Sequence, residues 1–114
     1  MASLREKIYN GNYDRAIKDF NQAIRLDREY SLAYVNRGSA YYLKNDYDRA
    51  ISDYTQAIRL DPNYTIAYYN RGSAYFSKRD YDQAIKDYET VLRLEPNHAD
   101  AKKQLDAVRQ ARGR

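Results

Sequence analysis

Side chains able to catalyse reactions at neutral pH are scarce in this chain of 114 residues. His98 is its single histidine and cysteine is absent, so the sequence offers no thiolate nucleophile and no cysteine-ligated metal. No Ser-His-Asp arrangement is evident around His98, and we interpret this residue as part of a turn. The residue types therefore predict that the protein is not an enzyme and has no catalytic residues.

Aspartates occur in two equivalent sets that superficially suggest a cation site. An EF-hand loop also requires glycine at its sixth position and glutamate at its twelfth, and both are missing here. Helix capping and the helix dipole account for the first two aspartates of each set, so we expect no metal and no cofactor. The two sets are Asp46, Asp48 and Asp53, then Asp80, Asp82 and Asp87.

The elements that carry these residues repeat every 34 positions. Residues 31–64 and 65–98 align without a gap and are identical at 20 of 34 positions. A fixed period of this length is typical of one supersecondary unit stacked on copies of itself.

Each unit contains two predicted helices. The second half has one apolar stripe at helical spacing, preceded by a residue able to cap a helix. The first half, residues 32–43 and 66–77, is apolar on more than one side, which predicts a helix buried between neighbours. Pro62 and Pro96 end the units because proline cannot continue a helix. The stripes are Ala50, Ile51, Tyr54, Ala57 and Ile58, then Ala84, Ile85, Tyr88, Val91 and Leu92, and the expected N-caps are Asn12, Asp46 and Asp80.

The residues of this period form a recognisable pattern. They are Tyr34, Gly38, Tyr41, Ala50, Tyr54, Ala57 and Pro62, and again Tyr68, Gly72, Tyr75, Ala84, Tyr88 and Pro96. The pattern resembles the tetratricopeptide repeat. The resemblance implies an all-α fold, a right-handed α-solenoid of tandem helix-turn-helix repeats, and a role as a protein-protein interaction adaptor or scaffold. Arg37 and Arg71 depart from it, because the family usually has leucine there, and Arg28 replaces the proline in the first copy.

We expect a single domain over residues 1–114, divided by the repeat. Residues 1–30 form a partial repeat, in which an opening helix of about residues 2–9 precedes a complete helix over 13–26. Full repeats occupy 31–64 and 65–98. Residues 99–114 form a capping helix and a basic tail, because Ala101, Leu105 and Val108 share one face of a segment that is otherwise polar.

Two features inside the repeat require a structural explanation. Glycine within a helix costs about 1 kcal/mol relative to alanine, so Gly38 and Gly72 predict close approach of a partner helix. An arginine at a usually apolar position must find a partner or extend to solvent. Three arrangements satisfy this requirement. Arg37 and Arg71 are expected to pair with Asp53 and Asp87 of their own repeats, or with Asp19 and Asp53 of the preceding ones. The third alternative is that both arginines face solvent on the groove.

The first helices of successive repeats line a concave surface in proteins that this chain resembles, and peptides bind along it. A row that mixes apolar side chains with amides is suited to holding a peptide and its backbone. The residues mapped to this groove are Leu32, Val35, Asn36, Ser39, Tyr42 and Leu43, then Ile66, Tyr69, Asn70, Ser73, Phe76 and Ser77. About a third of them are expected to pack against neighbouring repeats instead.

The resemblance also allows one family activity to be tested by residue type. Heat-shock chaperone tails are captured by a clamp of lysines, asparagines and an arginine. The clamp lysines correspond here to Met1 and Ile66 and the arginine to Asn70, so only Asn36 fits. We therefore expect a protein or peptide ligand other than the chaperone tails.

Two other functions compete with peptide binding. The incomplete first repeat leaves part of the face of Ala16, Phe20 and Ala23 uncovered. A second copy of the chain could cover it, which favours a self-associating homo-oligomer. Single-stranded RNA binding through tyrosine stacking ranks last, because the groove is mostly neutral and the net charge of +4 is mild. Nucleic acid is therefore not an expected partner.

The composition also predicts a compartment. No apolar run is long enough to span a membrane, and the start of the chain lacks the apolar stretch of a signal peptide. With no cysteine, the sequence suits a reducing compartment. We expect a cytoplasmic protein that does not associate with membranes.

Overall fold

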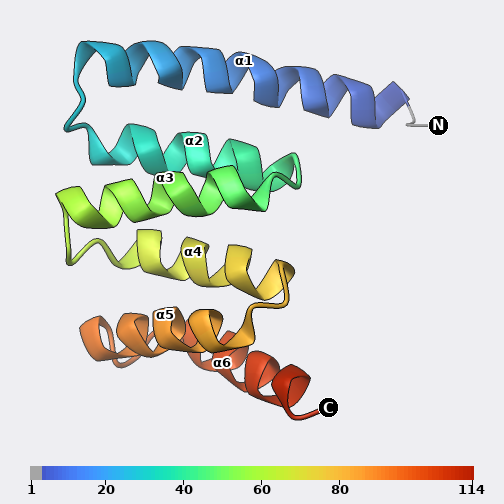
Figure 1. The fold of residues 1–114 in the computed structure, drawn as a ribbon, viewed down its shortest axis with the longest axis vertical. Coiled ribbons are helices and arrows are strands. Elements are labelled where there is room, and N and C mark those ends of the chain that lie inside the picture. The colour runs from blue at the N-terminus through green and yellow to red at the C-terminus, as the bar shows by residue number, and fades with distance from the viewer. Residues whose placement is uncertain (1–3) are drawn as a thin grey trace.

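The computed structural model describes the backbone of residues 4–114 and the side chains of residues 11–114. This part of the chain contains six α-helices and no strand. Figure 1 shows the first five stacked as successive antiparallel layers, with the sixth crossing behind α5. The helices are α1 (Leu4–Leu26), α2 (Ser31–Leu43), α3 (Tyr47–Leu60), α4 (Thr65–Ser77), α5 (Tyr81–Leu94) and α6 (Ala99–Arg112).

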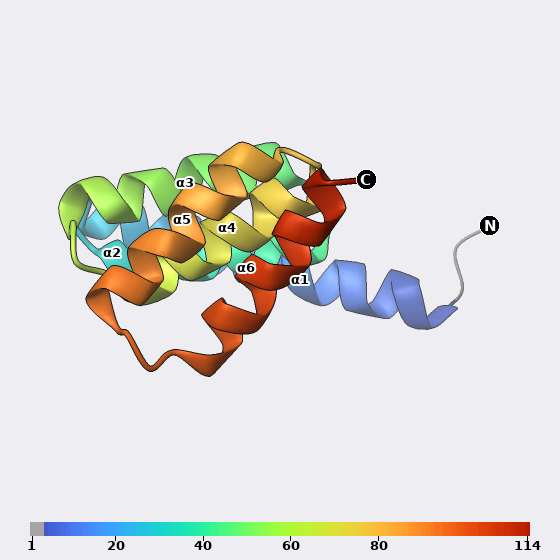
Figure 2. The same ribbon diagram turned by 90° about the horizontal axis from the view of Figure 1, so that it is seen from below.

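Helix pairing follows the 34-residue period. Within the repeats α2 packs on α3 and α4 on α5, and between repeats α1 contacts α2, α3 contacts α4 and α5 contacts α6. The view along the stack in Figure 2 shows α6 lying across its end. This arrangement confirms the expected all-α solenoid of helix-turn-helix repeats.

The core consists of small residues at helix contacts and of tyrosines between them. Ala50, Ala57 and Ala84 are fully buried, and Tyr54 and Tyr88 are the largest buried side chains, at 2% and 0% exposure. A buried phenol needs a hydrogen-bond partner. Each hydroxyl has one, because Tyr54 pairs with Ser39 at 3.0 Å and Tyr88 with Ser73 at 2.9 Å.

The two mid-helix glycines lie where α2 and α4 meet their partner helices. A Cβ on Gly38 would stand 2.9 Å from Tyr54 Cε1 and 3.1 Å from Asp53 Cβ, and one on Gly72 would stand 3.0 Å from Tyr88 Cε1. These distances are below ordinary van der Waals contact. The expectation of close approach is confirmed.

The helix ends match the sequence signals at most positions. Helices α3 and α5 end two residues before Pro62 and Pro96. Asp46 accepts a hydrogen bond from the Arg49 amide at 3.3 Å, as expected of an N-cap. Asp80 also occupies the N-cap position, of α5, as predicted, but its side chain makes no capping hydrogen bond. An ion pair with Arg49 holds the Asp46 carboxylate at the helix start, and the equivalent of Arg49 after Asp80 is an uncharged glutamine.

The first repeat differs from the prediction of two helices. Residues 4–26 form one continuous helix, so Asn12 lies inside α1 and is not an N-cap. The repeat register explains the difference, because Leu4 occupies the position of Gly38. If the chain turned back at Gly11 as the later repeats do, the Leu4 side chain would take the position of Gly38. At that position even a single Cβ would stand too close to Tyr54 in the next repeat. The predicted segment of residues 2–9 extends into residues 2 and 3, which lie outside the described residues.

Candidate functional site: the face of α2 and α4

Arg37 and Arg71 each join the two helices of their own repeat through a paired aspartate. Arg37 donates from Nε and Nη2 to the two carboxylate oxygens of Asp53, at 2.9 and 2.6 Å. Arg71 makes the same pair with Asp87, at 2.9 and 2.8 Å. Both partners lie in the arginine's own repeat, which decides between the two pairings left open, and the alternative of a solvent-exposed arginine is wrong.

The remaining guanidinium donor of each arginine contacts the preceding repeat. Arg37 Nη1 donates to Asn21 Oδ1 at 2.9 Å, and Arg71 Nη1 donates to Thr55 Oγ1 at 3.1 Å. The hydrogen bond to Asp53 raises the pKa of the Arg37 guanidinium. Burial raises the pKa of the Asp87 carboxyl, and the hydrogen bonds from Arg71 oppose that effect. Each arginine therefore links three helices and holds the face beside it in place.

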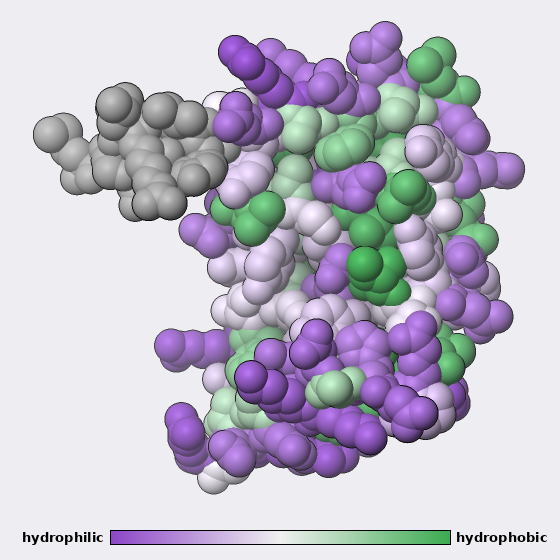
Figure 3. Space-filling model, turned by 180° about the vertical axis from the view of Figure 1, so that it is seen from behind, coloured by the Kyte–Doolittle hydropathy of each residue, from purple (hydrophilic) through white to green (hydrophobic). Residues whose placement is uncertain are grey.

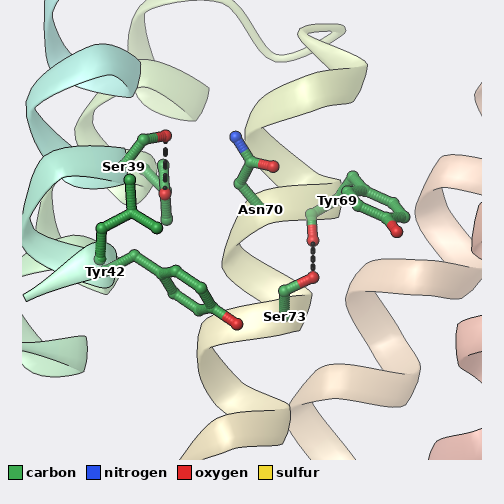
Figure 4. Close-up of a pocket in the computed structure, with 7 residues that line it drawn as sticks. Ser39, Tyr42, Tyr69, Asn70 and Ser73 are labelled. Atoms are coloured by element: carbon green, nitrogen blue, oxygen red, sulfur yellow. Dashed lines mark hydrogen bonds between the residues drawn. The ribbon is translucent and has the colours of Figure 1, made fainter. Parts of the chain in front are cut away.

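A cavity of about 290 Å³ opens between α2 and α4. Tyr42 and Leu43 border it from α2, and Tyr69 and Asn70 border it from α4 (Figure 4). The Ser39–Tyr54 bond closes its floor, and the Tyr42 hydroxyl lies 3.2 Å from Ser77 Oγ. None of the described residues that line this cavity is charged, so it suits an apolar side chain with neighbouring polar groups. The full lining is Ser39, Tyr42, Leu43, Tyr54, Tyr69, Asn70 and Ser73.

A second cavity of about 300 Å³ continues from the first toward α6. Tyr69 and Asn70 border both cavities, and Glu95, His98 and Asp100 supply the far wall. His98 stacks on Tyr69 with ring centroids 5.2 Å apart and caps α6 by accepting the Ala101 amide at Nδ1. Burial raises the pKa of the Tyr69 phenol, and Asp100 adds to the rise. The two cavities form one groove across α2, α4 and the start of α6.

The structure brings most of the predicted groove residues to this face. Ile66 borders the second cavity, together with Thr65, whereas Leu32 and Asn36 lie beyond both. Val35 is 3% exposed and belongs to the core, so its assignment to the lining is wrong. Phe76 is half-buried against Tyr81, with ring centroids 6.0 Å apart, and also lies outside the cavities. Because α2 and α4 have neighbours on both flanks, the solvent-facing stripe of each helix is narrower than the sequence pattern indicates.

Sequence reasoning missed five residues of the groove. One is Thr65, the first residue of α4, and the other four are Tyr54, Glu95, His98 and Asp100. The stripe of α3 placed Tyr54 in the core, and its hydroxyl is the part that reaches the cavity floor. The other three come from the segment around the start of α6. The repeat register carried the signal for one of them, because Asp100 is the equivalent of Ile66.

Hydrophilic surface surrounds this groove. Leu32, Leu43 and Ile66 are exposed large apolar residues at 43%, 54% and 50%. Figure 3 shows apolar surface gathered over the middle of the stack, with hydrophilic surface around it. Among the described residues no cluster of metal-ligating side chains occurs, and none of the helices in that part of the chain has the length and apolar character needed to cross a bilayer.

The comparisons with known proteins agree with this architecture. The TPR repeat model matches residues 5–45 and 38–78, and the tetratricopeptide repeat model matches residues 65–98. The chain belongs to the tetratricopeptide repeat family. A comparison with curated proteins gives no match.

Several solved structures are similar to this chain. The first TPR of Spaghetti (RPAP3), bound to the HSP90 peptide SRMEEVD, is 35% identical with a TM-score of 0.88, over 96% of this chain and 87% of that one. The first TPR domain of human RPAP3 is 36% identical with a TM-score of 0.88, over 96% and 86% of the two chains. The second TPR domain of human RPAP3, in complex with the HSP70 peptide SGPTIEEVD, is 37% identical with a TM-score of 0.83, over 87% and 82%.

These similarities correct one expectation about partners. The sequence argument against chaperone tails as ligands is contradicted, because similar TPR domains are bound to HSP90 and HSP70 peptides. That argument compared four clamp positions one by one and ignored α6. Lysine has a long, flexible stem and reaches an anion from neighbouring positions. The register places Lys103, an exposed residue of α6, at the equivalent of Tyr69, so α6 carries a cation that the comparison overlooked, although it lines neither cavity.

Proposed function

We propose that the protein binds a peptide segment of another protein along the groove of α2, α4 and α6, and that it acts by binding rather than by catalysis. The observation that carries this proposal is the uncharged cavity between α2 and α4, bordered by Tyr42 and Tyr69. It has room for one apolar side chain of an extended ligand. The Asn70 amide at its rim both donates and accepts hydrogen bonds, as a peptide backbone requires.

The similar domains supply the first ligands to test. SRMEEVD and SGPTIEEVD both end in Glu-Glu-Val-Asp, and this shared end combines one apolar side chain, the valine, with several carboxylates. In this chain the valine would enter the cavity beside Tyr69, and Lys103 would approach the carboxylates from α6. The proposal is therefore a scaffold that recognises the end of a partner chain.

Fluorescence anisotropy with the two labelled peptides and with a C-terminal peptide display library tests this function. Tyr42→Ala and Tyr69→Ala should each weaken binding about tenfold to a hundredfold, because each removes a large apolar contact. Tyr30→Ala is the matched control, since Tyr30 is an exposed tyrosine outside both cavities. Failure to find any ligand in either arm rejects the function. A ligand whose affinity is unchanged by both groove variants rejects the site.

A further inference from the structure

The second half of α1 presents a helix face that the described residues leave partly uncovered. The repeat register aligns Ala16, Phe20 and Ala23 with the α3 residues that α2 covers, which are at most 2% exposed. The three α1 residues stay half-exposed. Asp19 is also exposed, although its equivalent Asp53 is 5% exposed and paired. This part of α1 has the apolar stripe of a second repeat helix without a first helix against it.

The ion pairs between repeats show that α1 is positioned in the stack as α3 and α5 are. Arg112 pairs with Asp82 at 3.1 Å, and equivalent pairs join Lys44 to Asp14 and Lys78 to Asp48. Arg37 reaches back to Asn21 in α1 as Arg71 reaches back to Thr55 in α3. The uncovered stripe of α1 is therefore the one that a first helix occupies in a complete repeat.

The chain's own residues 4–9 do not cover this stripe. Gly11 aligns with Asn45 and Arg79, which turn the later repeats at φ 65°, and glycine adopts that conformation readily. Gly11 nevertheless lies inside α1, with nothing within 4 Å of where its Cβ would be. Leu4 aligns with Gly38, at the point of closest approach between two paired helices, and opposes the folded-back form.

We propose that a second copy of this chain covers the stripe, with its α1 antiparallel to the first. In a complete repeat Gly38 lies against Tyr54. The residues 34 positions earlier are Leu4 and Phe20, so the same pairing sets Leu4 of one copy opposite Phe20 of the other. Two whole helices packed at an ordinary separation of about 8–10 Å leave room for leucine there. The pairing is isologous about Asn12, so each contact occurs twice.

The charges along α1 agree with this register. An antiparallel pair centred on residue 12 sets Arg5 opposite Asp19, each seven residues from Asn12 and so on the same face, and this pair has opposite signs. Asn12 precedes Ala16 by four residues, so it lies on the same face of the helix. Residues 4–9 of each copy thereby take the place of a first repeat helix for the other. This dimer is independent of the peptide groove and goes beyond the proposed function.

A single introduced cysteine reports the register, because the chain has none of its own. Under mild oxidation Asn12→Cys should form a covalent dimer, since the two residues face each other across the two-fold axis. Gln22→Cys, an exposed residue two positions from Phe20 on the same helix, is the control and should stay monomeric on a denaturing gel. Equal cross-linking of the two variants overturns the antiparallel register.

Sedimentation velocity over a concentration series tests the pairing itself. The wild-type chain should dimerise, whereas Phe20→Glu should be monomeric with an unchanged helical circular dichroism spectrum. Asp19→Arg and Arg5→Asp should each weaken dimerisation, and the double variant should restore it. A wild-type monomer at the highest soluble concentration overturns the proposal, and so does a double variant that fails to regain the dimer.

Discussion

Arg71 faces Asp87 across the two helices of its repeat, with Nε and Nη2 donating to separate carboxylate oxygens. The aspartate side chain is 5% exposed and that of the arginine 19%. Breaking a buried pair leaves a desolvated charge without compensation, whereas replacing both partners by apolar residues often costs little. The pair thus occupies a position where an apolar side chain would also serve.

Removing only the arginine should destabilise the protein strongly. We expect Arg71→Ala to lower the free energy of unfolding by about 3–5 kcal/mol, because Asp87 stays buried without its partner. The double variant Arg71→Leu, Asp87→Leu should recover most of that loss. Lys78→Ala breaks an exposed pair with Asp48 and should cost far less than Arg71→Ala, because solvent screens the pair. Urea denaturation measures all three, and a small effect of Arg71→Ala would contradict the assigned role of the pair.

Substitution by alanine should change stability in opposite directions at Gly72, which lies at a close helix contact, and at Gly11, which lies at an open helical position. Gly72→Ala should destabilise the protein, because the new Cβ would stand 3.0 Å from Tyr88 Cε1 and 3.2 Å from Asp87 Cβ. Gly11→Ala should stabilise it by about 0.5–1 kcal/mol, since that site is helical and open. Thermal melts of the two variants give the comparison, and a stabilising Gly72→Ala would disprove the close approach.

Stability should fall in strong alkali because of two buried tyrosines. Burial raises the pKa of Tyr54 and of Tyr88 to about 12 from the ordinary value of 10.0, although serine hydrogen bonds oppose the rise. The folded state therefore holds protons that the unfolded state has released between pH 10 and 12. Stability is full below pH 10 and declines across that window by about 1.4 kcal/mol per pH unit for each tyrosine. In denaturation experiments at graded pH, Tyr54→Phe with Tyr88→Phe should flatten this decline, and an unchanged slope would exclude the two phenols as its cause.

The two aspartates that precede α3 and α5 should differ in their contribution. Asp46→Ala removes a side-chain bond to the Arg49 amide and should cost about 1 kcal/mol. Asp80→Ala removes no such bond and should cost less. Chemical denaturation of the pair of variants tests the assignment, which equal costs would refute.

The sequence predicts the repeating part of the fold well, because period, stripe and proline agree in both full copies. Arg37 shows the limit of prediction from the sequence. Its residue type required a partner, but pairing with Asp19 and pairing with Asp53 both satisfied the 34-residue period. Only the packing of α2 on α3 selects Asp53. Residue type alone also gave the wrong lining at Val35, since the width of the exposed stripe depends on neighbours that a single helix pattern does not contain. The first repeat was mispredicted because the two helices of the later copies were transferred to it by register alone, without weighing Leu4, whose bulk at the position of Gly38 opposes the turn.

The side of the groove between α4 and α6 shows a second limit of prediction from the sequence. His98 reads as a turn residue, and in the structure it caps α6 while stacking on Tyr69. The capping assignment depends on ring orientation, which no spacing rule provides. Comparing residues 99–112 with the first helices of the repeats would have identified Asp100 as a groove residue.

A cation at the C-terminal end of α2, of α4 and of α6 pairs with an aspartate of the preceding helix, 30 residues earlier at all three places. Every contact between successive repeats therefore has the same kind of ion pair, and any repeat can lie beside any other. Recombination between copies can lengthen or shorten the protein by a whole unit in one event. The new neighbours already carry matching partners, so no compensating substitution has to arise first.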